Sequence, residues 1–175
     1  MRAAYGMAGK GKSVLKAILI GFVVVAVGKA ADLSGLYVDT GTRIASSGSG
    51  SSPEEPSLYA LLKFEFESEM VRVLREQTAT VKIAHGRHLI EIAVFDAEGT
   101  ETWSALLAEG ERFSEQKERL VVRSPAGRFG DDKIVLILER VAEHGFLQVS
   151  VQRIVPTMFG PAARKLDTFL FQLAP

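Results

Sequence analysis

The hydropathy pattern of the chain opens with an uncharged apolar run of eleven residues, from Ala17 to Val27. A basic segment precedes this run, as is typical of an export signal. As a helix the run spans only ~16 Å, about half the hydrocarbon core of a bilayer. We therefore expect residues 1–31 to be a signal peptide or, if uncleaved, a membrane anchor that uses residues 14–31. A helix buried in the domain is the third interpretation. The flanking lysines are Lys10, Lys12, Lys16 and Lys29.

Beyond this run, apolar and polar side chains alternate over short segments separated by turns that contain Gly, Pro or Asp. Alternation with a period of two places one face of a β-strand against a core and the other in solvent. Because the segments recur every ~8 to 14 residues, we expect residues 32–175 to form an all-β domain. Its architecture would be an antiparallel β-sandwich or small barrel of about eight or nine strands. The predicted strands cover residues 36–38, 62–67, 81–83, 88–95, 100–107, 120–123, 133–139, 146–154 and 167–173.

Two parts of this pattern are ambiguous. Residues 41–56 read GTRIASSGSGSSPEEP, and so few apolar side chains predict a flexible loop within the domain or, alternatively, a tether. Residues 57–74 alternate like a strand around Phe64 and Phe66, yet they also place apolar side chains four residues apart, as a helix does. We favour a helical turn over residues 57–61 that runs into a strand.

The strand predicted over residues 133–139 is apolar on both faces, and the strand over 88–95 is nearly so. A strand with one face in solvent shows clean alternation, as Leu147, Val149 and Val151 do with the polar residues between them. Apolar side chains on both faces need a covering helix or loop, an apolar ligand cavity or a protein interface. A covering layer is favoured, and the other two alternatives stay open.

Composition narrows the classes of function. The chain has 175 residues, enough for one domain with a core, and no cysteine, which excludes disulfides, thiol chemistry and Cys-ligated metals. Five of the 21 basic residues lie in residues 1–31, which hold no acidic residue, so the remainder carries 16 basic against 21 acidic side chains. Nucleic acids require a concentrated basic surface, and no nucleic-acid partner is expected.

Residues with catalytic or metal-binding chemistry are sparse. His85 and His88 are three positions apart, so on a strand they would point to opposite faces. With Glu91 they are the only residues that we can name for an enzyme site. The sequence has no Gly-x-Ser-x-Gly motif, and the Ser/Gly run at 46–52 lacks the lysine of a phosphate-binding loop. We expect no enzymatic activity, no metal site and no cofactor.

Three short motifs carry a family resemblance: Leu33–Tyr37 (LSGLY), Asp96–Gly99 (DAEG) and Phe169–Phe171 (FLF). The first looks like the opening strand of lipocalin-type barrels, with Tyr37 in the Trp position. The wider layout resembles uncharacterised proteobacterial lipoproteins, which implies an exported β-rich domain. Lys29 stands where those lipoproteins carry the lipid-bearing Cys, so the resemblance does not extend to a lipid anchor.

We therefore expect a non-enzymatic accessory protein of the cell envelope, periplasmic and either released or tethered to the inner membrane. It would act through contact with a protein partner, for instance as an accessory subunit of a membrane complex. The alternative is a small barrel that binds an apolar ligand. The residues expected at the protein interface are Phe146, Met158 and Phe159, and those expected to line a ligand cavity are Trp103, Phe64, Phe66, Phe169 and Phe171.

Overall fold

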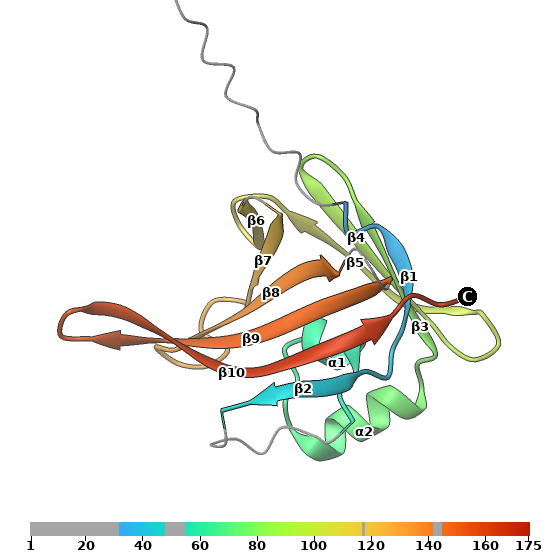
Figure 1. Ribbon diagram of the computed structural model, residues 1–175, viewed down its shortest axis with the longest axis horizontal. Coiled ribbons are helices and arrows are strands. Elements are labelled where there is room, and N and C mark those ends of the chain that lie inside the picture. The colour runs from blue at the N-terminus through green and yellow to red at the C-terminus, as the bar shows by residue number, and fades with distance from the viewer. Residues whose placement is uncertain (1–31, 48–54, 117, 142–144) are drawn as a thin grey trace, which may run out of the picture.

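Two antiparallel sheets make up most of the fold, as Figure 1 shows for the computed structural model of this protein. The structure describes residues 32–47, 55–116, 118–141 and 145–175. This part of the chain contains ten strands and two short helices. The signal peptide or anchor predicted over residues 1–31 lies outside the described residues.

A four-stranded sheet has the strand order β1-β3-β4-β5, and a six-stranded sheet has the order β2-β10-β9-β8-β7-β6. Both are built largely from hairpins between consecutive strands, as short turns between antiparallel strands favour. In the described residues the two sheets do not close into one barrel, so the barrel alternative is wrong and the two-sheet arrangement is the one found. The strands are β1 (Gly35–Val38), β2 (Thr42–Ser46), β3 (Thr80–His85), β4 (Leu89–Phe95), β5 (Glu101–Ala108), β6 (Phe113–Gln116), β7 (Arg119–Arg123), β8 (Lys133–Val141), β9 (Phe146–Thr157) and β10 (Gly160–Gln172).

The chain passes from one sheet to the other between β1 and β2. β1 pairs with β3, whereas β2 pairs with β10, so Thr42–Ser46 is an edge strand where a flexible loop was predicted. Gly41 lies at the crossing, where a Cβ atom would be 2.5 Å from Cε1 of Phe171. Only glycine fits this close approach of backbone to core.

Residues 57–76 form two helices, α1 (Leu58–Leu62) and α2 (Ser68–Glu76). The predicted helical turn is confirmed, but the strand predicted over 62–67 is wrong. Phe64 takes a left-handed conformation with φ of 58°, its N–H bonds Leu61 O at 2.8 Å, and the N–H of Glu65 bonds Ala60 O at 2.9 Å. These two bonds are those of a Schellman motif, which ends a helix and turns the chain.

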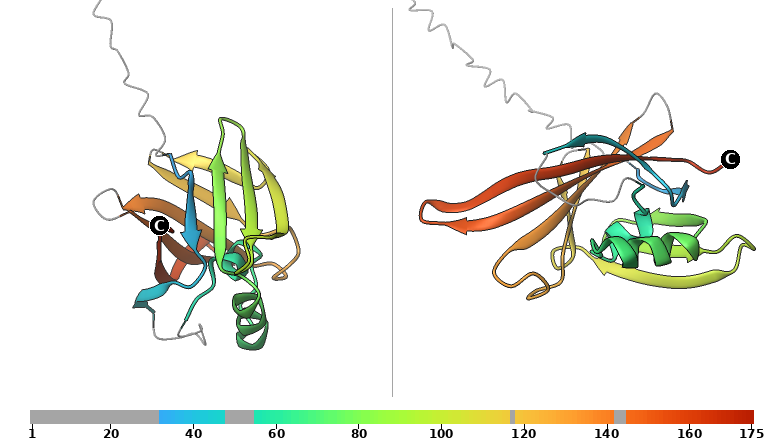
Figure 2. Two further views of the ribbon diagram at one scale, coloured as in Figure 1. Left: turned by 90° about the vertical axis from the view of Figure 1, so that its right-hand side faces the viewer. Right: turned by 90° about the horizontal axis from the view of Figure 1, so that it is seen from below.

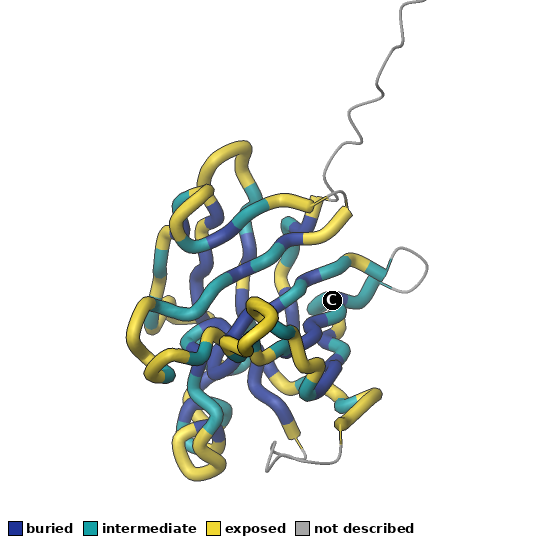
Figure 3. The backbone as a smooth tube through the Cα atoms, turned by 90° about the vertical axis from the view of Figure 1, so that its left-hand side faces the viewer, coloured by how far each residue is buried: buried dark blue, intermediate teal, exposed yellow. Residues whose placement is uncertain are grey.

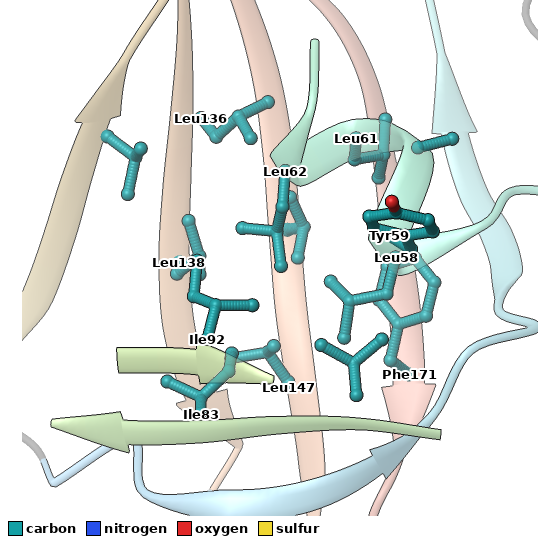
Figure 4. Close-up of a cluster of buried hydrophobic side chains, with 14 of the residues drawn as sticks. Leu58, Tyr59, Leu61, Leu62, Ile83, Ile92, Leu136, Leu138, Leu147 and Phe171 are labelled. Carbon is teal, nitrogen blue, oxygen red and sulfur yellow. The ribbon is translucent and has the colours of Figure 1, made fainter. Parts of the chain in front are cut away.

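α1 supplies the centre of the core. All five of its residues are buried. Figure 4 shows Leu58, Tyr59, Leu61 and Leu62 beside apolar side chains from both sheets. The left view of Figure 2 shows the helices at one end of the four-stranded sheet. The face of β8 that carries Leu136 and Leu138 belongs to this core, so a covering layer accounts for that face. Val135, on the opposite face of β8, is buried too.

The β9–β10 hairpin is longer than the sequence predicts. Strand β10 begins at Gly160, seven residues before the predicted strand at 167–173. Pro156 and Pro161 lie opposite each other near the end of the hairpin, outside the bounds predicted for its two strands at 146–154 and 167–173. A proline is tolerated where no further strand needs its missing N–H. The hairpin consequently extends far beyond the rest of the six-stranded sheet (Figure 1).

Candidate functional site: the hairpin tip

The end of the β9–β10 hairpin, residues 154–163, is the most unusual surface of the molecule, and we call it the hairpin tip. Its sequence, IVPTMFGPAA, contains no charge and a single polar side chain, that of Thr157. The side chains of Met158 and Phe159 are 97% and 100% exposed. Figure 3 shows exposed residues along this projecting end of the chain. Large apolar side chains are rarely left this exposed side by side unless they serve a contact.

Local hydrogen bonds hold the turn of the tip in shape. The N–H of Phe159 donates to Oγ1 of Thr157 at 3.3 Å, and the Thr157 hydroxyl donates to the carbonyl of Gly160. Gly160 has φ of 106°, a conformation that side chains disfavour. The turn is therefore ordered by its own residues, and a partner would meet a preformed apolar surface.

The charged residues of the hairpin nearest its tip are basic, and the one acid of its two strands, Asp167, lies further along β10 and is buried. Between residues 146 and 166 the charged residues are Arg153, Arg164 and Lys165. Arg153 is committed to an ion pair, since its Nε donates to Oδ2 of Asp132 at 2.7 Å. Arg164 and Lys165 are exposed. An apolar tip is thus bounded by positive charge.

Phe146 does not belong to this tip. It is the first residue of β9, at the opposite end of a twelve-residue strand from Thr157. At ~3.3 Å per residue this separates it from the tip by about 36 Å. Of the three residues expected at an interface, the structure brings together Met158 and Phe159 only.

The aromatic residues expected to line a ligand cavity contribute to packing. Phe64, Phe169 and Phe171 are almost completely buried in the core. The other two pair with aromatic neighbours: Trp103 lies 5.2 Å from Tyr59 and Phe66 lies 5.9 Å from Phe129, between ring centroids. Such tilted aromatic pairs stabilise packing beyond the area that they bury.

The apolar cavity that Phe66 and Phe169 border is small. Its volume is about 30 Å³, room for one water-sized molecule. Ligand sites usually measure ~300 Å³ or more. The predicted ligand residues are therefore not assembled around a space of that size.

The residues named for an enzyme site have separate partners. His85 Nε2 lies 2.9 Å from Glu115, and His88 Nδ1 lies 2.6 Å from Glu109. Glu91 lies on β4 opposite Leu106 of β5 and takes part in neither pair. Within the described ranges, no three His, Asp or Glu side chains are arranged to hold a metal ion. Neither of the two described helices has the length and hydropathy needed to cross a membrane.

One buried acid stands out. Asp39, at the crossing between the sheets, is fully buried, and this burial raises the pKa of its carboxyl group to about 6. Hydrogen bonds from Tyr59 N–H, at 2.7 Å, and from Ser57 act in the opposite direction. Asp39 also accepts the N–H of Leu58 through its carbonyl at 2.9 Å, so it fixes the start of α1.

A second surface feature, a pair of arginines, cannot be predicted from the sequence pattern. Arg112 and Arg123 are eleven positions apart, yet the N–H of Arg123 bonds Arg112 O at 2.8 Å, and Nε of Arg112 donates to Arg123 O at 3.3 Å. Both side chains border a surface cavity of about 640 Å³ near the stem of the hairpin. The register between β6 and β7 brings the two arginines together, and no motif in the sequence predicts this pair.

Comparison with known families, curated proteins and solved structures finds no match to this chain.

Proposed function

We propose that this chain is a non-enzymatic accessory protein of the cell envelope and that it binds a protein partner through the hairpin tip. The observation that carries the proposal is the full exposure of Met158 and Phe159 on an ordered, projecting turn. The basic, apolar N-terminal sequence supports the location, since it is typical of exported or membrane-tethered proteins.

The energetics favour a contact function. Burying one Phe or Met side chain contributes about 1.5–3 kcal/mol, so a groove that received Met158 and Phe159 would gain about 3–6 kcal/mol. Aromatic residues and Met are also enriched at the centres of protein interfaces. Because Thr157 and Gly160 already order the turn, little conformational entropy is lost on binding.

Binding of an apolar ligand inside the domain is the weaker proposal. The aromatic residues that would line the site are occupied with one another or with the core, and the nearby cavity holds about 30 Å³. An opening large enough for a ligand would have to break those contacts. The packed interior therefore supports the contact proposal over the ligand proposal.

A site-specific crosslink tests the contact directly. The full-length chain, carrying a photo-crosslinking phenylalanine analogue at position 159, would be irradiated in the envelope of cells that express it. The matched position is Leu106 on β5, which is 68% exposed and far from the hairpin in sequence. We expect a discrete protein adduct from position 159 that is absent from position 106, and that disappears when Met158→Ser is added.

Two other crosslinking results can be distinguished from the expected one. Adducts to lipid alone would show that the tip contacts the membrane surface and not a protein partner. Identical adducts from positions 159 and 106 would mean that the tip has no preference of its own. Either result contradicts the proposal.

A further inference from the structure

A surface cavity of about 640 Å³ lies between the β7–β8 loop, the ends of β7 and β8, and the stem of the β9–β10 hairpin. Its volume falls within the usual range of small-molecule sites, ~300–1,000 Å³. The loop that forms one wall is ordered by backbone bonds, including Ser124 N–H to Ile134 O at 2.9 Å. We call this site the arginine cavity.

Basic residues outnumber acidic residues in its lining by one. Arg112, Arg123 and Lys133 border the cavity, against two acids, Glu111 and Asp132. Asp132 is already bound by Arg153, which lies on the neighbouring strand β9. The cavity is therefore cationic on an otherwise mildly acidic domain, and an anion would be attracted to it.

Arg123 is incompletely bonded. Its Nη2 donates to Oγ of Ser114 at 2.8 Å, which holds the guanidinium plane in place. Its Nη1 is buried and has no hydrogen-bond partner among the described residues. A buried donor on a charged group is destabilising until it is paired. Because Nη1 is buried, an anion in the cavity pairs with it only after a small rotation of the Arg123 side chain.

Apart from Ser124 and two glycines, the rest of the lining is apolar. It comes from the loop, from β8 and from the hairpin stem, and it includes Val135, whose side chain on the outer face of β8 is buried. A bare inorganic ion would leave this surface unused, whereas an anion with a short apolar group would cover it. The other apolar lining residues are Pro125, Ala126, Ile134, Ile154 and Pro161.

We infer that the arginine cavity binds a small organic anion, in which a carboxylate or phosphate group is joined to a short apolar group. The anionic group pairs with Arg112 and Arg123, because a guanidinium donates two parallel hydrogen bonds to either oxyanion. The apolar part lies against Val135 and Pro161. The cavity borders the hairpin tip through Ile154 and Pro161 but includes neither Met158 nor Phe159, so either proposal can fail without the other.

Three probes test the inference on the full-length chain in non-ionic detergent: inorganic phosphate, hexyl phosphate and hexanoate. The readout is the NMR signal of the arginine Nε–H groups, with affinity from calorimetry. We expect hexyl phosphate or hexanoate to shift the signals of Arg112 and Arg123 and to bind more tightly than inorganic phosphate does. Arg123→Gln should weaken binding about tenfold or more, as loss of a charge-assisted hydrogen bond does.

Two further variants make the test specific. Lys133→Gln removes an exposed cation from the cavity, cannot disturb the core, and should weaken binding about threefold. Arg72→Gln removes an exposed cation from α2, which pairs with Glu76, and should leave binding unchanged. The inference is overturned if none of the probes shifts the two arginine signals, or if the cavity variants bind as the parent does.

Competition identifies the source of the anion. Mixed micelles of the same detergent with phosphatidic acid would displace hexyl phosphate if the natural ligand is a lipid headgroup, whereas mixed micelles with phosphatidylcholine would not. No displacement by either kind of micelle assigns the site to a soluble anion. Both results support the cavity as a binding site.

Discussion

Replacing Asp39 with asparagine should make the protein more stable at neutral pH. Burial raises the pKa of the Asp39 carboxyl to about 6 from an ordinary value of 3.8. The folded state therefore keeps its proton at pH values where the unfolded state has lost it. Because the folded state binds more protons between these values, stability falls as the pH rises through this window. The favourable contribution is fully present below pH 3.8 and is lost as the pH rises through about 6.

The magnitude follows from the two pKa values. Their difference corresponds to about 3 kcal/mol, at about 1.4 kcal/mol per pH unit. Asn cannot ionise, and its carbonyl oxygen can still accept the N–H of Tyr59. Its amide N–H₂ would occupy the position of Oδ2, which has no partner among the described residues, at a cost of about 1 kcal/mol at every pH. Asp39→Asn should thus lose about 1 kcal/mol near pH 4 and gain about 2 kcal/mol above pH 7.

Urea denaturation of the full-length chain in non-ionic detergent, followed through the fluorescence of the single Trp, provides the assay. Trp103 packs on Tyr59, whose N–H bonds Asp39, so its emission reports on this part of the core. Asp131→Asn, in an exposed loop, is the control for the change in net charge. A stability difference between parent and Asp39→Asn that stays constant from pH 4 to pH 8 would refute the reasoning.

Two further predictions concern packing near Asp39, where the chain crosses from one sheet to the other between β1 and β2. Gly41→Ala should lower stability by about 2–3 kcal/mol, because its Cβ meets Phe171 at 2.5 Å, whereas Gly99→Ala, with φ of 79° and open space around it, should lose only about 1 kcal/mol. Equal losses in urea titrations would contradict this. Tyr37→Phe removes a buried hydroxyl that donates to Leu33 O at 2.9 Å and should lower stability by about 1 kcal/mol. An unchanged denaturation midpoint would show that this bond contributes nothing.

Alternation predicts strands well where one face of a central strand enters the core. β4 is found at Leu89–Phe95, within one residue of the segment predicted at 88–95, because Ile90, Ile92 and Val94 all face inward. β2 and β6 escaped prediction for the opposite reason. They are the outer strands of the six-stranded sheet, and each has few apolar side chains. β2 also pairs with β10, which is distant in sequence, whereas β6 is a four-residue strand that pairs with the next strand, β7.

The helices show a different limit of prediction from the sequence pattern. Apolar residues at 58, 62, 66, 70 and 74 fit one helix, yet the structure breaks the segment at Phe64. A left-handed residue other than Gly, Asn or Asp costs about 1–2 kcal/mol, which local preference alone would avoid. Phe64 is buried, and its burial contributes about 1.5–3 kcal/mol, enough to offset that strain. The free energy that offsets the strain comes from tertiary packing, so it cannot be predicted from the local sequence pattern.

Pro156 and Pro161 lie in the part of the hairpin that was not predicted from the sequence, and they also restrict what the hairpin can bind. Pro156 and Pro161 lack the backbone N–H that an added strand would need, so the tip is a poor template for pairing with a strand from another chain. Recognition by strand addition, which relies on main-chain hydrogen bonds, is thereby disfavoured. What the tip still presents is side chains, Met158 and Phe159 above all. The protein partner that we propose would therefore offer a concave apolar surface rather than an open sheet edge, and this expectation follows from the backbone chemistry of the tip.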